Sequence, residues 1–345
     1  MKDDEITRNL FFEVLKNKEQ ALIDDMQRKI PLQIQHPTEI QKTYGGVIGY
    51  EDIKENITRQ LSHISLSHEE LAKEEKFHIV TPKGILLYGP PGNSKTVLAS
   101  AAAKEHDLYF VKVLSKDFAS VSEEAQLRNL QLIFDQAIQL SNICDSAKGV
   151  LLFFDEVDAL ASQLHLSSVI RGTLLDYLAN EMGVRAKNSK VVVVAATNYY
   201  SLLDEAVIRK GRIDEHFCMD NPSEVHGKKI IEEINREDSE IVESLTPELL
   251  SNIYQSAKLR VQEKEYQKLA LYSLNTEDFK NALAQIKRVR ASGADLVDVY
   301  QNLKSTAYRL KKINRDKIQI DQEVLNKVLP TTETLKEMQE VLKMN

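Results

Sequence analysis

Residues 84–106 read GILLYGPPGNSKTVLASAAAKEH and contain the segment that decides the fold. The apolar run GILLY is followed by a glycine- and proline-rich turn and then by an alanine-rich stretch, which predicts strand, tight loop and helix in that order. The loop GPPGNSKT, residues 89–96, follows the phosphate-binding pattern G-x-x-x-x-G-K-[ST] except at Ser94, where the pattern has glycine. A strand before the loop and a helix after it are the context that a phosphate loop requires.

The chemistry of this loop depends on its backbone and on two side chains. Two glycines let the backbone N–H groups turn toward phosphate oxygens, and the start of the helix adds its positive end. Lys95 would reach the β- and γ-phosphates of a nucleotide, and the Thr96 hydroxyl would hold Mg²⁺. The residues expected to bind nucleotide here are Gly89, Pro90, Pro91, Gly92, Asn93, Ser94, Lys95, Thr96 and Val97.

Ser94 raises the question of whether this site works. A serine with a negative φ fits at little cost, whereas a positive φ costs about 1–2 kcal/mol. Such a cost would weaken nucleotide binding without abolishing it. We interpret the site as active, because a decayed site would be expected to lose Lys95 or a catalytic acid at least as readily as this glycine.

Apolar runs alternate with helical patterns between residues 84 and 217. Runs without polar interruption suit strands that are buried on both faces, and they predict an α/β fold with a parallel sheet covered by helices. Beyond residue 222 the β-branched clusters disappear and the pattern is helical. The expected strands are GILLY (84–88), LYFVKVL (108–114), GVLLFF (149–154) and VVVVAA (191–196).

The third of these runs ends in two carboxylates, in GVLLFFDEVDAL at residues 149–160. Asp155 would join the Mg²⁺ shell, and Glu156 would act as the general base for the attacking water. An acidic turn after an apolar strand is common by itself. The acidic turn becomes a stronger signal when a phosphate loop precedes it. The carboxyl ends of parallel strands meet at one edge of the sheet, so the two motifs would lie close together.

The fourth run ends in Thr197 and Asn198, and an amide at that place can align a water against a γ-phosphate. Arg209 and Arg212 follow in RKGRIDEHF, and an arginine can stabilise charge on a transferred phosphoryl group. These arginines come after an acidic turn, Asp204-Glu205. A surface ion-pair role is therefore the alternative for them.

Bulk composition excludes several classes of protein. The chain has 345 residues, a net charge of -7 and two cysteines that form no C-x-x-C pair. This argues against a disulfide framework, a zinc module and broad nucleic-acid binding, and it favours a reducing cytoplasm. No run approaches the ~20 apolar residues of a membrane span, and the acidic N-terminus does not resemble a signal peptide.

Taken together, these motifs resemble the AAA family of ATPases. The order of phosphate loop, D-E strand end, T-N strand tip and RKGRIDEHF is that of the family, and YGGVIGYEDIKENI (44–57) resembles the segment that precedes its phosphate loop. TLLDYLANEMG (173–183) is similar to the helix after the acidic strand, and LNTEDFKNALAQIKRVRAS (274–292) is similar to the end of the helical lid.

The resemblance implies specific roles. Ile48 and Gly49 would lie near adenine, Asn198 would be a sensor, and Arg209 and Arg212 would be arginine fingers that reach the ATP of a neighbouring subunit in a ring, usually of six. The implied cofactors are ATP and Mg²⁺. The implied domains are an N-terminal helix and linker (1–43), the nucleotide-binding domain (44–222), a helical lid (223–292) and a C-terminal helical extension (293–345).

The chain departs from the family at two places. The aromatic pore loop that grips substrate would fall on Ser122, Glu123 and Glu124, so threading is not predicted, and the carboxylates suit a basic peptide instead. The nearest aromatic, Phe118, fits a core position. The family's GADL helix start is displaced to 292–296, where it either opens a C-terminal helix or marks a rearranged lid.

Three functions are compatible with these patterns. The first is a ring ATPase that remodels a protein substrate or adaptor, which the full catalytic set favours. The second is a nucleotide-switched scaffold that hydrolyses slowly or not at all, which Ser94 favours. The third is a nucleic-acid-associated loader, which the net charge disfavours. The N-terminal helix expected at about 5–30 either binds a partner or packs on its own domain.

Overall fold

The structure is a computed structural model of the chain, and it divides into two compact units. The first unit comprises Met1–Gly89 and Ser94–Met219, and the second comprises Pro90–Asn93 and Asp220–Asn345. The structure describes residues 17–30, 32–62, 64, 84–114, 122–143, 146–161, 168–179, 190–209, 211–237, 247–270, 290–309, 313–314, 317–318, 324 and 327–328.

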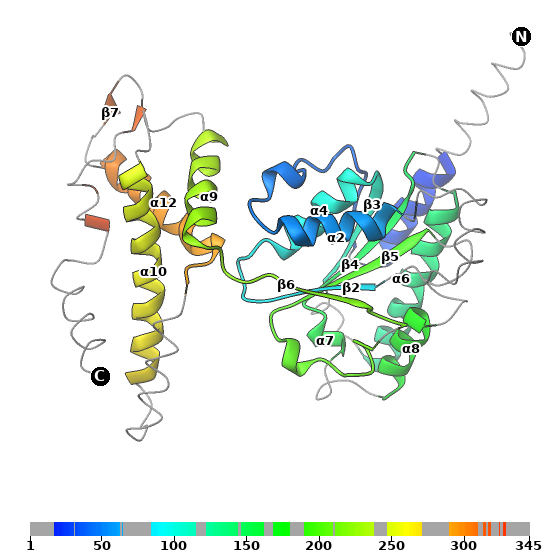
Figure 1. Cartoon of the computed structure of the whole chain (residues 1–345). Helices are drawn as coiled ribbons and strands as arrows, with labels where there is room; N and C mark the ends of the chain where they lie inside the picture. The colour runs from blue at the N-terminus through cyan, green and yellow to red at the C-terminus, as the bar shows by residue number, and fades with distance from the viewer. Residues whose placement is uncertain are drawn as a thin grey trace, which may run out of the picture. The chain divides into compact units, whose positions relative to one another are not determined.

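A six-stranded sheet forms the centre of the first unit (Figure 1). The strand order is β1-β3-β4-β5-β2-β6, and all neighbours are parallel except β1, which runs antiparallel to β3. The four expected strands and the predicted α/β class are confirmed. The strands are β1 (Gln33–Gln35), β2 (Gly84–Tyr88), β3 (Leu108–Leu114), β4 (Gly149–Asp155), β5 (Val191–Thr197) and β6 (Glu215–Cys218).

The two strands that the sequence did not predict lie at the edges of the sheet. β1 falls inside the stretch expected to be a linker, and its Gln33 and Gln35 side chains are exposed. β6 is also short, and its side chains are half-buried or exposed. Edge strands face a core on fewer sides, so they need no apolar run, and the pattern that revealed the central strands is missing from them.

Helices cover both faces of the sheet (Figure 1). One face packs against α2 and α4, through side chains such as Ile57 and Leu98. The other face packs against α6 and α8, through side chains such as Phe134 and Leu174. The helices of this unit are η1 (Tyr44–Gly46), α2 (Glu51–Ser62), α4 (Lys95–Glu105), α6 (Glu123–Ile143), α7 (Asp158–Ala161), α8 (Ser168–Ala179) and η3 (Tyr200–Leu202).

Residues 17–29 are helical and belong to the same core. Ile23, Met26 and Ile30 are buried, and they pack in the cluster that contains Phe134 of α6. Of the two roles considered for the N-terminal helix, packing on its own domain therefore describes this part. Residues 1–16 lie outside the described residues.

The second unit has a separate helical core. Helices α9 (Glu224–Glu237), α10 (Pro247–Ala270) and α12 (Gly293–Arg309) bury Ile231, Tyr254 and Leu296 together. The displaced GADL sequence therefore opens α12, and α12 shares its core with α9 and α10. The predicted division at 292/293 remains a prediction, although the packing joins α12 to the lid helices. A short antiparallel pair, β7 (Ile313–Asn314) and β8 (Lys317–Ile318), follows α12.

None of the described helices is both long enough and apolar enough to cross a membrane.

Candidate functional site

The phosphate loop leaves the sheet at the end of β2 in close contact with neighbouring backbone. Gly89 has φ +144, and a Cβ at this position would lie 2.3 Å from the carbonyl oxygen of Met219. The Gly89 N–H donates to the carbonyl of Thr197 at the end of β5 (3.3 Å). A side chain cannot fit here, so glycine is required by the packing of the loop as well as by its backbone angle.

Ser94 adopts the left-handed conformation, with φ 61 and ψ 24. It is the residue before α4, its side chain caps no backbone group, and its carbonyl accepts the first α4 bond from Leu98 (2.8 Å). The loop thus has the left-handed backbone conformation that favours glycine at this position. A serine in this conformation is strained by about 1–2 kcal/mol. From the sequence, we expect a strain at Ser94 only if its φ is positive, and the structure has a positive φ there.

Lys95 is the first residue of α4 and directly follows Ser94. Its side chain is buried, and its Nζ donates to the Gly89 carbonyl at 2.7 Å. Burial lowers the pKa of Lys95, and the nearby charge of Asp155 partly opposes that shift. An anionic phosphate at this place would favour the charged ammonium, so the residue is suited to the predicted role.

Thr96 and Asp155 meet although they come from different elements. Thr96 Oγ1, in the first turn of α4, donates to Asp155 Oδ2 at the end of β4 (3.2 Å). Lys112 Nζ of β3 lies 2.9 Å from the same carboxylate oxygen. The hydroxyl and the carboxylate are hard oxygen donors of the kind that Mg²⁺ prefers. Sequence reasoning paired Thr96 with Asp155 but did not identify Lys112.

Glu156 follows directly and turns away from strand geometry. It is exposed and has φ 54, in the left-handed region. The next N–H, that of Val157, donates to the carbonyl of Ala196 in β5 (2.9 Å). This bond fixes the acidic turn against the neighbouring strand. A strained residue at such a place is typical of functional sites.

The tip of β5 provides a polar network beside this turn. Thr197 Oγ1 donates to Asp158 Oδ1 (2.6 Å) and accepts the N–H of Tyr199 (2.9 Å). Asn198 Oδ1 is buried and has no hydrogen-bond partner among the described residues. A buried acceptor of this kind needs a donor, and a water or substrate group would supply one.

The structure distinguishes the two predicted arginines. Arg209 is exposed, whereas the half-buried Arg212 donates to the carbonyl of Ala206. Asp204, one of the acids suggested as an ion-pair partner, pairs instead with Arg171 of α8 (2.9 Å). Arg209 is therefore the more exposed of the two arginines and the more accessible to an external partner.

The remaining predicted contacts lie in the segment before α2. Ile48 is half-buried, and Gly49 is buried with φ +82. The neighbouring Val47 packs in the core beneath α4. Their predicted position near adenine stays a prediction. At the start of α6, Ser122, Glu123 and Glu124 are exposed, and Phe118 lies outside the described residues.

The middle of the phosphate loop, Pro90–Asn93, belongs to the second unit. Asn93 Nδ2 donates to Asn221 Oδ1 (2.6 Å), and Asn221 Nδ2 donates to the carbonyl of Arg290 (2.8 Å). The Ala294 N–H donates to the carbonyl of Gly92 (3.3 Å). The loop is thus bonded to the start of α12 and to the segment before it.

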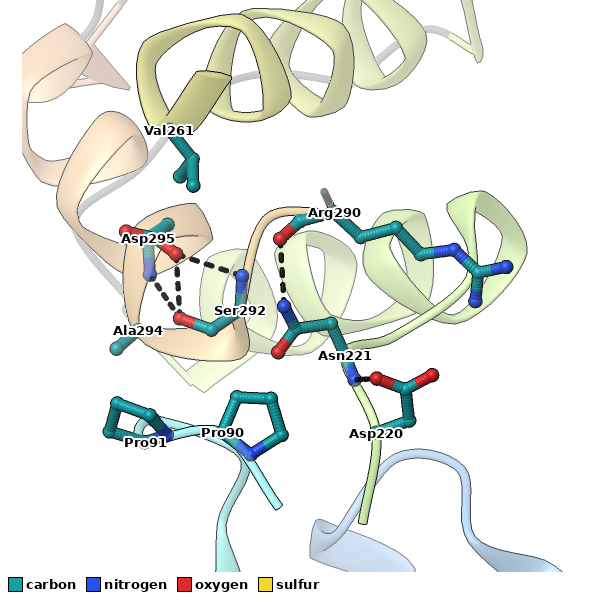
Figure 2. A pocket seen from close by; sticks show the side chains of 10 residues that line it. Pro90, Pro91, Asp220, Asn221, Val261, Arg290, Ser292, Ala294 and Asp295 are labelled. Atoms are coloured by element: carbon teal, nitrogen blue, oxygen red, sulfur yellow. Dashed lines mark hydrogen bonds between the residues drawn. The ribbon is translucent and has the colours of Figure 1, made fainter. Parts of the chain in front are cut away.

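A pocket of about 760 Å³ lies between this part of the loop and the start of α12 (Figure 2). Figure 2 shows the two proline rings of the loop on one side and the start of α12 on the other. Ser292 and Asp295 cap α12 reciprocally, with Ser292 N–H to Asp295 Oδ2 (2.8 Å) and Asp295 N–H to Ser292 Oγ (3.2 Å). The lining residues are Pro90, Pro91, Gly92, Asp220, Asn221, Val261, Arg290, Ser292, Ala294 and Asp295.

Sequence reasoning missed Asn221, Ser292 and Asp295. The S-x-x-D spacing at 292–295 is a capping-box signal, and it agrees with the helix start considered for residues 292–296. Residues 292–295 are far from the phosphate loop in the sequence, so no local pattern could predict that this segment contacts Gly92.

The residues fit a magnesium nucleotide. The loop contains glycines with positive φ, and a buried lysine follows it at the start of α4. The Thr96 hydroxyl oxygen and an Asp155 carboxylate oxygen lie 3.2 Å apart. Among the described residues, no group of three or more His, Cys, Asp or Glu could hold a metal by itself. Mg²⁺ is usually bound through one or two protein oxygens together with phosphates.

Comparison with known proteins gives the same assignment. Residues 85–221 match the family described as "ATPase family associated with various cellular activities (AAA)". The proteasome-activating nucleotidase of Methanothermobacter thermautotrophicus is 32% identical over 220 residues, 61% of this chain and 51% of that protein. Cell division protein C of Sulfolobus acidocaldarius is 29% identical over 277 residues, 75% of this chain and 70% of that protein.

A third relative, from Corynebacterium kroppenstedtii, has the name "AAA ATPase forming ring-shaped complexes" and is 29% identical over 202 residues, 54% of this chain and 34% of that protein. The chain therefore spans about half the length of the nucleotidase and about a third of the ring-forming relative. The matched region contains the phosphate loop, the acidic strand end, the T-N strand tip and the arginines. Residues 85–221 of this chain therefore form an AAA ATPase domain.

Proposed function

We propose that this chain hydrolyses ATP as a subunit of a ring and couples hydrolysis to the conformational remodelling of a protein partner. The observation that carries the proposal is the junction of Thr96 Oγ1 with Asp155 Oδ2 (3.2 Å), beside the buried Lys95. Helix α4 and strand β4 supply these groups, and their meeting forms the phosphate end of a nucleotide site.

The phosphate loop binds the triphosphate in this proposal. Backbone N–H groups of the loop and the start of α4 would face the phosphate oxygens, and Lys95 would exchange its bond to the Gly89 carbonyl for a bond to phosphate. Thr96 and Asp155 would hold Mg²⁺. Bound Mg²⁺ supplies charge neutralisation at the β- and γ-phosphates.

Hydrolysis transfers the γ-phosphoryl group of ATP to water and releases ADP. Glu156, exposed beside Asp155, would take the proton from the attacking water. The buried Asn198 Oδ1 would orient that water, because it is an acceptor with no partner among the described residues. These two residues follow the carboxyl ends of neighbouring strands, β4 and β5.

The ring is proposed from the arginines and from the name of one relative. The exposed Arg209 would reach the γ-phosphate of a neighbouring subunit, where an arginine is worth about 10³–10⁵ in rate. The name of the ring-forming relative supports assembly, and a ring of six is the proposed size. A protein partner is proposed from the relative named as a proteasome-activating nucleotidase. A cytoplasmic location is proposed from the cysteine content alone.

The second candidate is a nucleotide-switched scaffold that hydrolyses slowly or not at all. The left-handed Ser94 favours it, because a strained loop binds phosphate less well. A nucleic-acid-associated loader is the third candidate. The net charge of -7 weakens it, since phosphate neutralisation needs clustered basic side chains.

Glu156→Gln tests the proposal. The amide removes the general base and keeps the size of the side chain, so turnover should fall about 10²–10⁴-fold while ATP binding persists. Measured by steady-state hydrolysis and by ATP retention on the purified assembly, the variant should hold ATP and its protein partner together. Glu205→Gln, also at an exposed glutamate, is the matched control and should behave as wild type.

A wild type that turns over as slowly as Glu156→Gln would favour the scaffold. Binding to DNA with a steep salt dependence would favour the loader.

A further inference from the structure

Lys112 of β3 contacts the carboxylate at the end of β4, and the proposed function gives this lysine no role. Lys112 Nζ lies 2.9 Å from Asp155 Oδ2, and the two side chains are 18% and 21% exposed. The run LYFVKVL is otherwise apolar, so Lys112 is the one charged residue of β3. A cation on a largely buried strand is costly unless it is paired, which indicates that the contact with Asp155 is specific.

The register of the sheet accounts for this contact. Lys112 pairs with Phe153, and Asp155 lies two residues further along β4, on the same face. Phe110 and Phe153 on that face pack beneath α4. The lysine therefore approaches the carboxylate from the sheet, while Thr96 approaches it from the helix.

Both contacts use the same oxygen. Asp155 Oδ2 accepts the Thr96 hydroxyl at 3.2 Å and lies 2.9 Å from the Lys112 ammonium. A metal ion that is drawn to this carboxylate must share it with a positive charge or displace that charge. The same ammonium is a cation close to the phosphate end of the site, so it favours a triphosphate that arrives without metal.

We propose that Lys112 is a positioning residue that holds Asp155 and competes with Mg²⁺ for it, so that Lys112 limits how strongly ATP binding depends on magnesium. The inference rests on the proposed function, because it takes Asp155 as the carboxylate of the metal site. It adds a determinant of metal dependence to that site.

The first experiment uses Mg²⁺ alone and needs no nucleotide. Thermal midpoints of the full chain are measured across a range of MgCl₂ concentrations, with NaCl adjusted to constant ionic strength. Lys112→Met removes the competing charge, so the apparent Mg²⁺ affinity should rise about tenfold, the effect of one screened ion pair. The gain should disappear in Lys112→Met combined with Asp155→Asn, because the carboxylate is then absent.

The second experiment measures a fluorescent ATP analogue by equilibrium binding, in Mg²⁺ and in EDTA. The dissociation constant in EDTA divided by that in Mg²⁺ should rise about tenfold in Lys112→Met. The metal-free nucleotide then binds without the attraction of a nearby cation, and the magnesium complex can use a carboxylate that is no longer paired. Lys112→Arg keeps the charge and should keep the ratio. Lys148→Met, an exposed lysine just before β4, is the control for loss of a positive charge.

Lys112→Gln, which retains a hydrogen-bond donor without charge, replaces Lys112→Met if the latter fails to fold. An unchanged magnesium affinity and an unchanged ratio in the neutral variants would overturn the proposal and leave Lys112 as a purely structural ion pair. If the wild type binds no nucleotide in either buffer, the proposed function fails, and the experiment with Mg²⁺ alone still decides the role of Lys112.

Discussion

The phosphate-loop side and the arginine side of the proposed site differ in how far one chain completes them. On the loop side, Lys95, Thr96 and Asp155 are buried or half-buried and held by bonds from different elements. On the arginine side, Arg209 is exposed, and Arg212 donates to a backbone carbonyl of its own segment. One chain therefore assembles the groups that would bind a nucleotide, whereas the guanidinium remains available for another molecule.

This difference suggests a division of labour within the proposed ring. Groups that bind must be preorganised before the nucleotide arrives, so they are packed into the core around β2 and β4. A group that acts only in the transition state can be supplied by a neighbouring subunit, and an exposed arginine in a turn suits that role. Binding and turnover should then respond differently to substitutions on the two sides.

Arg209→Ala should have the largest effect. Turnover should fall about 10³-fold or more, because the charge that stabilises the transferred phosphoryl group is lost, while ATP affinity stays within about twofold. Steady-state hydrolysis and equilibrium binding measure the two quantities. Arg128→Ala, at an exposed arginine of α6, is the control and should keep both.

Mixing variants makes this test sharper. Arg209→Ala and Lys95→Ala subunits are each inactive in the proposal, yet a mixed ring joins an intact Lys95 to an intact Arg209 at some interfaces. Hydrolysis should then recover in part on mixing. If a monomeric Arg209→Ala protein hydrolysed ATP at the wild-type rate, the arginine would have no role between subunits.

Lys95→Ala should give the next largest effect, on the loop side. Loss of a charge-assisted bond to phosphate should weaken ATP binding about 10–100-fold. The measurement is equilibrium binding of the fluorescent analogue. Lys148→Ala removes an exposed lysine directly before β4 and should bind the analogue as the wild type does. Equal affinity in the two variants would refute the assignment of the phosphate loop.

Gly92→Ala and Gly211→Ala compare the two sides directly. Both glycines have positive φ, of +80 and +90, so alanine is strained at both. At Gly92 the new Cβ would also lie 2.8 Å from Ala294 Cβ and from Ser292 Oγ, whereas no described atom lies within 4 Å at Gly211. Gly92→Ala should cost about 1–3 kcal/mol more in unfolding free energy.

Chemical denaturation of the two alanine variants measures that difference. Equal costs would show that the contact of the loop with the start of α12 does not contribute to stability.

The sequence predicted the features that depend on local pattern. The four central strands are unbroken apolar runs, and the loop motif contains Lys95 and Thr96 in adjacent positions. It could not predict β1, whose Gln33 and Gln35 are polar because an edge strand needs little burial. Nor could it predict that Lys112 would contact Asp155, because that contact depends on the register between β3 and β4.

The conformation of Ser94 shows the same limit at a single residue. The motif marks the position, but its φ follows from the way the loop joins α4, which no local pattern specifies. Because φ is 61, Ser94→Gly should remove the strain of a left-handed serine and raise the unfolding free energy by about 1 kcal/mol. That is the smallest of the predicted effects.

Ser100→Gly provides the control for this last prediction, because it makes the same substitution within α4, where glycine should cost about 0.5–1 kcal/mol. Chemical denaturation of both variants should therefore give changes of opposite sign. If Ser94→Gly destabilises the protein as Ser100→Gly does, the loop does not hold Ser94 in the left-handed conformation in solution. The scaffold alternative would then lose the strain that favours it, because a relaxed loop would leave nothing at this position to slow hydrolysis.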